Sequence, residues 1–370
     1  MTFSQWITDS DWQTVKDEIM QKSGRDVEQA LSKNRCDIED FKALISPAAG
    51  AYLEQIAHKS QQLTRQRFGA TVSFYIPLYL SNLCSNSCTY CGFSMENRIK
   101  RRTLSMQDVR EEFLAIKQKG YDSILLVTGE HTRKVGINYF RQVLPLAKEH
   151  FSYVALEVQP LSAEEYCELK LLGLNAVYVY QETYHRHTYK RHHLRGNKTD
   201  FDFRLETAER LCQSEIDKVG LGALLGLHDW RIDSFATASH LRYLENRYWK
   251  TRYSVSFPRL RPCEGMNMEI NEISDRELVQ LICAYRIFSP SVELSLSTRE
   301  SSAFRDNVVP LGITNISAES RTQPGGYAKT AKELEQFSVS DQRKTKEVAN
   351  AMQKNGLQPV FKDWEYIYRA

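Results

Sequence analysis

Long apolar runs are absent from this chain of 370 residues, and so is a large excess of either charge. No stretch approaches the roughly 18 apolar residues that a membrane-spanning helix needs. The opening "MTFSQWITDSDWQ" has no basic segment followed by an apolar one, so it lacks the pattern of a secretory signal. A net charge of +3 is too small to indicate a nucleic-acid or membrane partner. We therefore expect a cytoplasmic globular protein.

Eight short apolar runs alternate with helical patterns through most of the chain. Residues 1–71 lack such runs and carry apolar residues at three- and four-residue spacing, which predicts an N-terminal helical region. From residue 72 on, the runs have the composition of buried strands, and the segments between them have helical spacing. The runs lie at 72–80, 123–129, 153–159, 175–181, 218–226, 253–259, 292–298 and 311–317.

This alternation predicts parallel βαβ units, and eight of them close into a (β/α)8 TIM-type barrel. We expect the barrel over 72–320, with an open doubly wound sheet as the alternative. The tail, 321–370, opens on a Pro-Gly-Gly turn, contains one amphipathic helix and ends in an aromatic segment. We expect it to form a C-terminal extension that packs back on the barrel.

Three of the eight cysteines fall within the segment "CSNSCTYC", directly after the first predicted strand. The spacing is C-x3-C-x2-C, at Cys84, Cys88 and Cys91. In a reducing compartment, clustered thiols indicate a metal site rather than a disulfide. Zinc would need a fourth ligand, such as His131, whereas three thiolates on a [4Fe–4S] cluster leave one iron open to a small molecule. The loop would lie at the carboxyl-terminal face, where barrel enzymes carry their chemistry.

With an aromatic residue, Tyr90, before its last cysteine, the loop resembles that of the radical S-adenosylmethionine (SAM) superfamily. The resemblance implies a [4Fe–4S] cluster on the three cysteines, SAM on the open iron and Tyr90 beside it. In that superfamily the reduced cluster cleaves SAM to methionine and a 5′-deoxyadenosyl radical, which takes a hydrogen atom from the substrate. We expect Cys36, Cys167, Cys212 and Cys283 to be ordinary thiols.

Polar residues at the ends of the next three predicted strands are candidates for contacts to SAM. The second strand ends "LLVTGEH", where the superfamily typically has Gly-Gly-Glu and this chain has Thr128 in place of the first glycine. A glycine permits close approach of the backbone, and a carboxylate suits the ammonium group of SAM. The candidates are Gly129, Glu130, Glu157, Gln159, Gln181 and Glu182. Gly220, Gly222 and Gly226 of "VGLGALLG" either admit a flat adenine or allow close packing of a helix on the strand.

Arginines follow the sixth and seventh predicted strands, at Arg259, Arg261 and Arg299. At a barrel mouth, inward-facing arginines favour bidentate capture of a carboxylate, although each could instead pair with a loop acid. They indicate an amino-acid-like or acidic substrate. The basic segment 97–102 is expected to close the cysteine loop or to present a docking surface to an acidic electron donor. The histidine-rich segment 184–193 is expected to be a solvated loop containing one catalytic group, with a second metal site as the alternative.

Several stretches together resemble the radical SAM tyrosine lyases of bacterial thiazole (thiamine) biosynthesis, the 2-iminoacetate synthases, over essentially the whole chain. They are "SFYIPLYLSNLCSNSCTYCGFSMENRIKRRTL", "LLVTGEH", "EVQPL", "VYQETYH", "GLGALLGL", "SFPRLRP", "LSTRE" and "QPGGY". The resemblance implies hydrogen abstraction from the amino group of L-tyrosine and scission of its Cα–Cβ bond, giving 2-iminoacetate and 4-methylphenol. It implies thiazole synthase as acceptor of the iminoacetate, and reduced flavodoxin or ferredoxin, ultimately NADPH, as electron source.

A sister branch that matures [FeFe]-hydrogenase carries a C-terminal C-x2-C…C site for a second cluster. No cysteine follows Cys283 here, which favours the thiazole branch. Related aromatic-amino-acid lyases imply a clamp for the substrate carboxylate made of Arg299, Tyr79 and Ser317. Pinning the carboxylate would turn the amino group, rather than Cβ, toward the radical.

Two other readings remain open, a radical SAM enzyme acting on another amino acid and a non-catalytic iron–sulfur electron-transfer protein. The second needs neither an open iron nor converging arginines.

Overall fold

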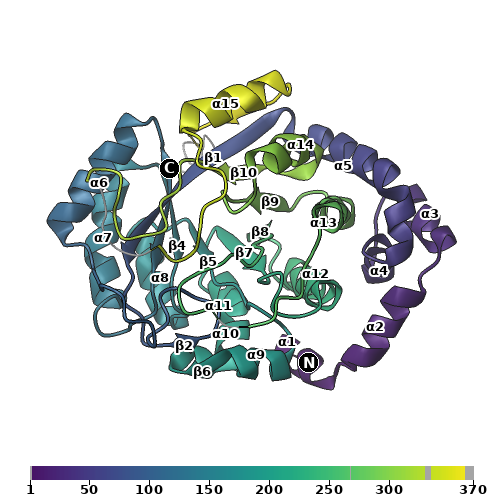
Figure 1. Ribbon diagram of the computed structural model, residues 1–370, viewed down its shortest axis with the longest axis horizontal. Coiled ribbons are helices and arrows are strands. Elements are labelled where there is room, and N and C mark those ends of the chain that lie inside the picture. Colours follow the sequence, from purple (N-terminus) through teal and green to yellow (C-terminus); the bar gives the residue numbers. More distant parts are fainter. Residues whose placement is uncertain (1, 267, 330–334, 363–370) are drawn as a thin grey trace.

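Eight parallel strands close into a barrel in the computed structural model, which describes residues 2–266, 268–329 and 335–362 (Figure 1). The strands are β1 (Thr71–Ser81), β3 (Ser123–Thr128), β4 (Tyr153–Glu157), β5 (Ala176–Tyr178), β7 (Lys218–Gly222), β8 (Arg252–Ser256), β9 (Glu293–Leu296) and β10 (Asn315–Ser317). Pairing of β10 with β1 closes the ring, with Ser73 opposite Asn315. The predicted barrel is confirmed, and the open-sheet alternative is wrong.

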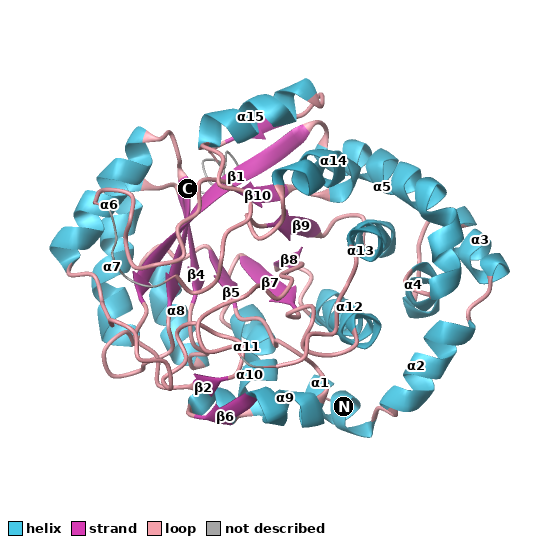
Figure 2. Cartoon of the chain, in the orientation of Figure 1, coloured by secondary structure: helices cyan, strands magenta, loops and turns pink. Residues whose placement is uncertain are grey.

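Helices cover the outside of the barrel, as Figure 2 shows. They are α6 (Met106–Gln118), α7 (Ile137–His150), α8 (Ala163–Leu171), α11 (Thr207–Gln213), α12 (Trp230–Arg247), α13 (Asp275–Phe288) and α14 (Ser302–Gly312). Three of them begin with a capping box, in which a serine and an acid three residues later satisfy the first free backbone N–H groups. The serines are Ser105, Ser162 and Ser274. Between β5 and β7 the chain also forms α9 (Arg186–His192), β6 (His193–Arg195), a 3-10 turn (Asn197–Thr199) and α10 (Phe201–Leu205).

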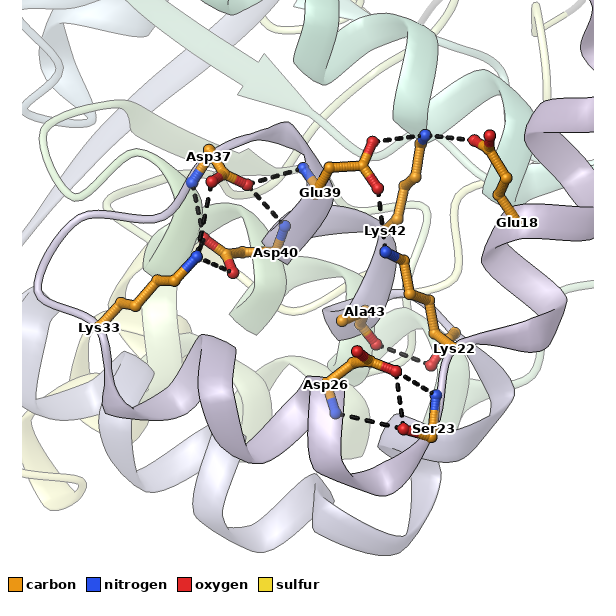
Figure 3. Close-up of polar contacts among 11 residues, drawn as sticks. Glu18, Lys22, Ser23, Asp26, Lys33, Asp37, Glu39, Asp40, Lys42 and Ala43 are labelled. Carbon is orange, nitrogen blue, oxygen red and sulfur yellow. Dashed lines mark hydrogen bonds and ion pairs between the residues drawn. The ribbon is translucent and has the colours of Figure 1, made fainter.

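The N-terminal helices wrap around one side of the barrel (Figure 1). They are α1 (Phe3–Asp9), α2 (Trp12–Gln21), α3 (Gly24–Ser32), α4 (Ile38–Leu44), a 3-10 helix (Pro47–Tyr52) and α5 (Leu53–Phe68). The buried ring of Phe41 packs between those of Tyr285 and Phe288, 4.9 and 5.0 Å away. Lys42 of α4 pairs with Glu18 of α2 and with Glu39, as Figure 3 shows. The Phe41 contacts hold α4 against α13, and the Lys42 ion pairs join α4 to α2.

The tail returns to the barrel at two places. Its strand β11 (Gln358–Val360), which follows α15 (Thr345–Lys354), pairs in parallel with the start of β1. Upstream of α15, the segment 335–341 crosses the mouth of the barrel. There the N–H of Gly92 donates to the carbonyl of Gln336 (3.2 Å), and the N–H of Asp341 donates to the carbonyl of Thr298 (3.1 Å). The aromatic end of the tail lies outside the described residues.

Polar and aromatic side chains face the barrel axis, where many barrels carry packed aliphatic layers. The amino-terminal half encloses a cavity of about 340 Å³, lined by Tyr153, Tyr178, Lys218 and Glu293 among others. This cavity lies beneath the carboxyl-terminal mouth of the barrel. Among the described helices, none combines the length and apolarity needed to cross a membrane.

Candidate active site at the carboxyl-terminal mouth

The loop after β1 brings Cys84, Cys88 and Cys91 to the wall of one cavity, which we call the cysteine cavity. The loop is held by pairing with a distant segment, because β2 (Ser87–Cys88) is antiparallel to β6 and places Cys88 opposite His193. Burial raises the pKa of Cys84 to about 11 and raises that of Cys88 further. Without a bound metal these sulfurs are therefore thiols, and metal binding must displace their protons.

Arg101 fixes the shape of the cysteine loop from within. Its guanidinium donates four hydrogen bonds of 2.6–3.1 Å to backbone carbonyls of the loop. The acceptors belong to Asn82, Phe93, Ser94 and Asn97. The basic segment 97–102 thus closes the loop through Arg101, and the side chain of Asn97 adds hydrogen bonds to the carbonyls of Cys91 and Gly92.

Three thiols around one cavity fit a [4Fe–4S] cluster, whose protein ligands bind different irons. Within the described ranges, no three Cys, His, Asp or Glu side chains lie together as ligands of a single ion do. His131 instead accepts a hydrogen bond at Nδ1 from the N–H of Lys134 (3.3 Å). This geometry matches neither the zinc alternative nor a metal site in the histidine-rich segment. Cys263, which the sequence reasoning passed over, donates its S–H to the carbonyl of Tyr90 (3.1 Å) and does not line the cavity.

Gly129 packs directly against the cysteine loop. A Cβ at this position would lie 2.5 Å from the carbonyl oxygen of Leu83, so only glycine fits. Its N–H donates to the carbonyl of Ser81 (2.9 Å), and the next carbonyl, that of Glu130, accepts from the N–H of Ser85 (2.9 Å). The end of β3 and the cysteine loop therefore form one unit.

An alternating network of acids and bases borders the cysteine cavity. Glu130 pairs with Arg204 and accepts from Asn86, both at 2.8 Å, and Glu182 pairs with Lys198 at 2.6 Å. Burial disfavours the charged carboxyls, but Arg204 and Lys198 outweigh it and hold the pKa of Glu130 and Glu182 below its ordinary value. The site thus presents ionised acids and their paired cations. Sequence reasoning missed Arg204 and Lys198, which follow β6 in a segment without a motif.

Gln181 and Glu182, the two candidates for SAM contacts that follow β5, point in different directions. Gln181 is buried, donates to the carbonyl of Phe201 (3.4 Å) and does not line the cavities at the mouth. Glu182 lines them and has φ of +72°, a conformation that non-glycine residues seldom adopt and that concentrates at functional sites. Its carbonyl accepts from the N–H of Leu224 (2.7 Å).

The glycines of β7 make room for tyrosine rings. A Cβ on Gly220 would lie 1.9 Å from the ring of Tyr178, and one on Gly222 would lie 3.1 Å from that of Tyr180. These two positions are thus closely packed, but against tyrosine side chains at the neighbouring strand β5 and just after it, not against a helix.

The histidine-rich segment clamps the cysteine loop. His193 is buried and its Nδ1 contacts the carbonyl of Tyr189 (2.7 Å), which can only accept, so Nδ1 carries the proton. Nε2 is then the acceptor for the hydroxyl of Tyr90, also at 2.7 Å. Thr89 and His192 form a neighbouring hydrogen bond of 2.7 Å.

A second cavity of about 150 Å³ adjoins the first, and we call it the arginine cavity. Arg299 lines it, with its guanidinium stacked on the ring of Phe337 at 3.4 Å and one donor on the carbonyl of Arg259 at 3.3 Å. Among the described residues no carboxylate pairs with Arg299, whereas Arg259 and Arg261 both pair with Glu300. Of the three predicted arginines, Arg299 is the one without a carboxylate partner in the described part of the chain.

Tyr79 and Ser317 line the same cavity as Arg299. The Oγ of Ser317 is buried and has no hydrogen-bond partner in the described part of the chain. The hydroxyl of Tyr79 donates to Oε1 of Gln336 (2.7 Å), a residue that sequence reasoning missed. The structure thus brings the three predicted clamp residues together next to the cysteine cavity.

A (β/α)8 barrel with a three-cysteine loop after its first strand, beside a cavity bordered by acids, defines a radical SAM enzyme. Residues 78–238 match the family model of the radical SAM superfamily, and residues 256–358 match that of the Biotin and Thiamin Synthesis associated domain.

The chain is 57% identical to 2-iminoacetate synthase of Escherichia coli (strain K12), over 100% of this chain and 98% of that one. It is 55% identical to the 2-iminoacetate synthase of Salmonella typhimurium, over 98% and 97% of the two chains. The chain belongs to the 2-iminoacetate synthase family. The predicted radical SAM lyase is confirmed, and the family's cofactors are a [4Fe–4S] cluster and SAM.

Among solved structures, the FeFe-hydrogenase maturase HydG from Carboxydothermus hydrogenoformans is 29% identical, with a TM-score of 0.90 over 99% of this chain and 86% of that one. Methylornithine synthase (PylB) has a TM-score of 0.73 at 19% identity over 90% of this chain and 97% of its own, a likeness of fold alone.

Proposed function

We propose that this enzyme cleaves the Cα–Cβ bond of L-tyrosine to 2-iminoacetate and 4-methylphenol, and that the iminoacetate supplies the thiazole moiety of thiamine. Cys84, Cys88 and Cys91 would hold the [4Fe–4S] cluster, with SAM at its open iron. Bound there, the two cofactors supply a 5′-deoxyadenosyl radical when an electron arrives, with release of methionine.

The observation that carries the proposal is the guanidinium of Arg299, which lies next to the cysteine cavity and has no carboxylate partner among the residues that the structure describes. Its planar donors match a carboxylate in two-point contact. The hydroxyls of Tyr79 and Ser317 in the same cavity are suited to the remaining lone pairs of that carboxylate. An amino acid held in this way presents its α-amino group toward the cysteine cavity.

For SAM, the residues that border the cysteine loop are the best candidates. Glu130 offers a carboxylate to the ammonium group of SAM, and Gly129, which lines the same cavity, lets the end of β3 pack closely against the cysteine loop. Lys198 and Arg204, which hold Glu130 and Glu182, supply positive charge for the SAM carboxylate. Tyr90, fixed by His193, would flank the ligand.

The electron source and the product acceptor are separate parts of the proposal. Exposed Met95, Arg98 and Lys100 lie on or just after the cysteine loop, and exposed Arg195, on the strand paired to it, lies 3.8 Å from Glu96. This rim suits an acidic flavodoxin or ferredoxin in the cytoplasm. Thiazole synthase would take up the iminoacetate.

Anaerobic enzyme with reconstituted cluster, incubated with SAM, dithionite and L-tyrosine, tests the proposal directly. We expect 4-methylphenol, 5′-deoxyadenosine and glyoxylate, the hydrolysis product of 2-iminoacetate, by mass spectrometry. Omission of SAM and replacement of tyrosine by other amino acids are the controls. Product from another amino acid and none from tyrosine would favour the rival radical SAM reading.

A further inference from the structure

Glu157, at the end of β4, lines both the cysteine cavity and the arginine cavity. A substrate held at Arg299 and attacked from the cysteine cavity must place its reacting atom along the wall that the two cavities share. Other residues on that wall include Glu182, Lys198 and Gln336, of which the first two form an ion pair. Glu157 is the carboxyl group on this wall that forms no hydrogen bond or ion pair with the described residues.

The charges that face Glu157 come from several elements. Arg299 lies after β9, Glu182 after β5, Lys198 after β6 and Arg204 on α10. Burial is the largest effect and raises the pKa of Glu157 to about 7, Glu182 adds to the rise, and the three cations oppose it. Three tyrosines also interact with the carboxyl electrostatically, Tyr75 and Tyr79 from β1 and Tyr180 from the segment after β5. Glu157 therefore exchanges a proton near neutral pH, as an effective general base does.

Tyrosine poses a chemical requirement that such a group meets. The amino acid arrives at neutral pH with an ammonium group, which has no lone pair. Loss of a hydrogen atom from it would leave a positively charged nitrogen radical, whereas loss from the neutral amine leaves a neutral one. A base beside the nitrogen removes this obstacle.

We propose that Glu157 is the general base that takes one proton from the ammonium group of bound tyrosine before hydrogen abstraction. The N–H bond breaks with its electron pair left on nitrogen, an O–H bond forms on Glu157, and no oxidant or reductant is needed. The proton leaves to solvent when the products depart, which restores the carboxylate. This inference rests on the proposed tyrosine lyase function.

Glu130 and Glu182 are poorer bases for this step. Each is paired with a cation that favours its ionised form, so each holds a proton less readily than Glu157. Their contacts fit them for binding SAM instead.

The test compares Glu157→Gln with the unmodified enzyme by the rate of 4-methylphenol formation across pH. The unmodified rate should fall as pH drops through about 7, because a protonated Glu157 cannot accept a proton. The glutamine variant should be slower at neutral pH by about a hundredfold or more, the typical range for a lost acid–base group. Its rate should climb as pH rises toward the ionisation of tyrosine's own ammonium group, since the substrate then arrives partly as the free amine.

Iron content and SAM affinity are measured on the same samples. Glu182→Gln is the matched control, expected to weaken SAM binding and to retain an acid limb, which moves to lower pH because Glu182 no longer raises the pKa of Glu157. If the glutamine variant fails to hold iron, Glu157→Asp replaces it, with an acid limb expected at a different pH. A rate within about twofold of the unmodified enzyme, an unchanged acid limb, or a loss confined to SAM affinity would overturn the inference. If the unmodified enzyme forms no 4-methylphenol, the proposed function itself has failed. The unmodified enzyme alone shows this, so the result is distinct from any effect of the variants.

Discussion

Gln336 accepts a hydrogen bond from the hydroxyl of Tyr79 at 2.7 Å, and its amide nitrogen lies 3.7 Å from the sulfur of Cys91. One residue of the C-terminal segment thus touches both a predicted clamp residue and a predicted cluster ligand. Because Phe337, the next residue, stacks on Arg299, this segment forms one wall of the arginine cavity.

Replacing Gln336 with leucine should uncouple SAM cleavage from product formation. A hydrogen bond of this kind is worth about 0.5–1.5 kcal/mol, so we expect the KM for tyrosine to rise about two- to tenfold. The ratio of 5′-deoxyadenosine to 4-methylphenol should rise as well. Gln353→Leu, at an exposed position on α15, is the matched control and should leave the ratio unchanged. An unaltered ratio and KM in Gln336→Leu would show that the segment only covers the mouth.

Cys88→Ala should lose most of its iron and its SAM cleavage after anaerobic reconstitution, because the cluster loses one of three thiolate ligands. Cys167→Ser and Cys263→Ser should keep about four irons per chain, since neither residue lines the cysteine cavity. Iron assay and visible absorption measure the outcome. Full SAM cleavage by Cys88→Ala would rule out the assigned ligand set.

Arg101→Lys should weaken retention of the cluster. A lysine cannot reach four carbonyls from one planar group, and each hydrogen bond from a charged donor contributes about 1.5–3 kcal/mol. We expect faster loss of iron to a chelator than in the unmodified enzyme. Arg98→Ala, an exposed neighbour, should release iron at the ordinary rate. Equal rates for both variants would mean that the loop holds its shape without Arg101.

Much of the scaffold could be predicted from the sequence because it depends on local pattern. Each of the eight predicted apolar runs overlaps a barrel strand, since burial on both faces gives each strand a continuous apolar signal. The cysteine loop and Arg299 were found from spacing and from position after a strand. The pairing of Cys88 with His193, more than a hundred residues away, has no local signal. The same holds for Gln336, Lys198 and Arg204, whose placement depends on how loops cross the mouth.

Arg299→Lys should keep the cluster and still cleave SAM, yet form little 4-methylphenol. Lysine preserves the charge but offers no planar two-donor contact, so the carboxylate can pivot about one point. A misplacement of about 1 Å at the reacting centre costs on the order of a hundredfold in rate. Arg261 pairs with Glu300, so Arg261→Lys should keep SAM cleavage far better coupled to 4-methylphenol formation. Normal coupling in Arg299→Lys would move the clamp to Arg259 or Arg261.

The most direct test of the central claim, that the clamp directs the amino group of tyrosine to the radical, is a turnover in deuterium oxide. Hydrogens on nitrogen exchange with solvent, as does the phenol hydrogen at the opposite end of the substrate from the clamped carboxylate, whereas those on Cα and Cβ do not. The account predicts that 5′-deoxyadenosine formed with unlabelled tyrosine gains one deuterium, seen by mass spectrometry as an increase of one mass unit. Unlabelled 5′-deoxyadenosine together with 4-methylphenol would show abstraction from carbon and would contradict the account.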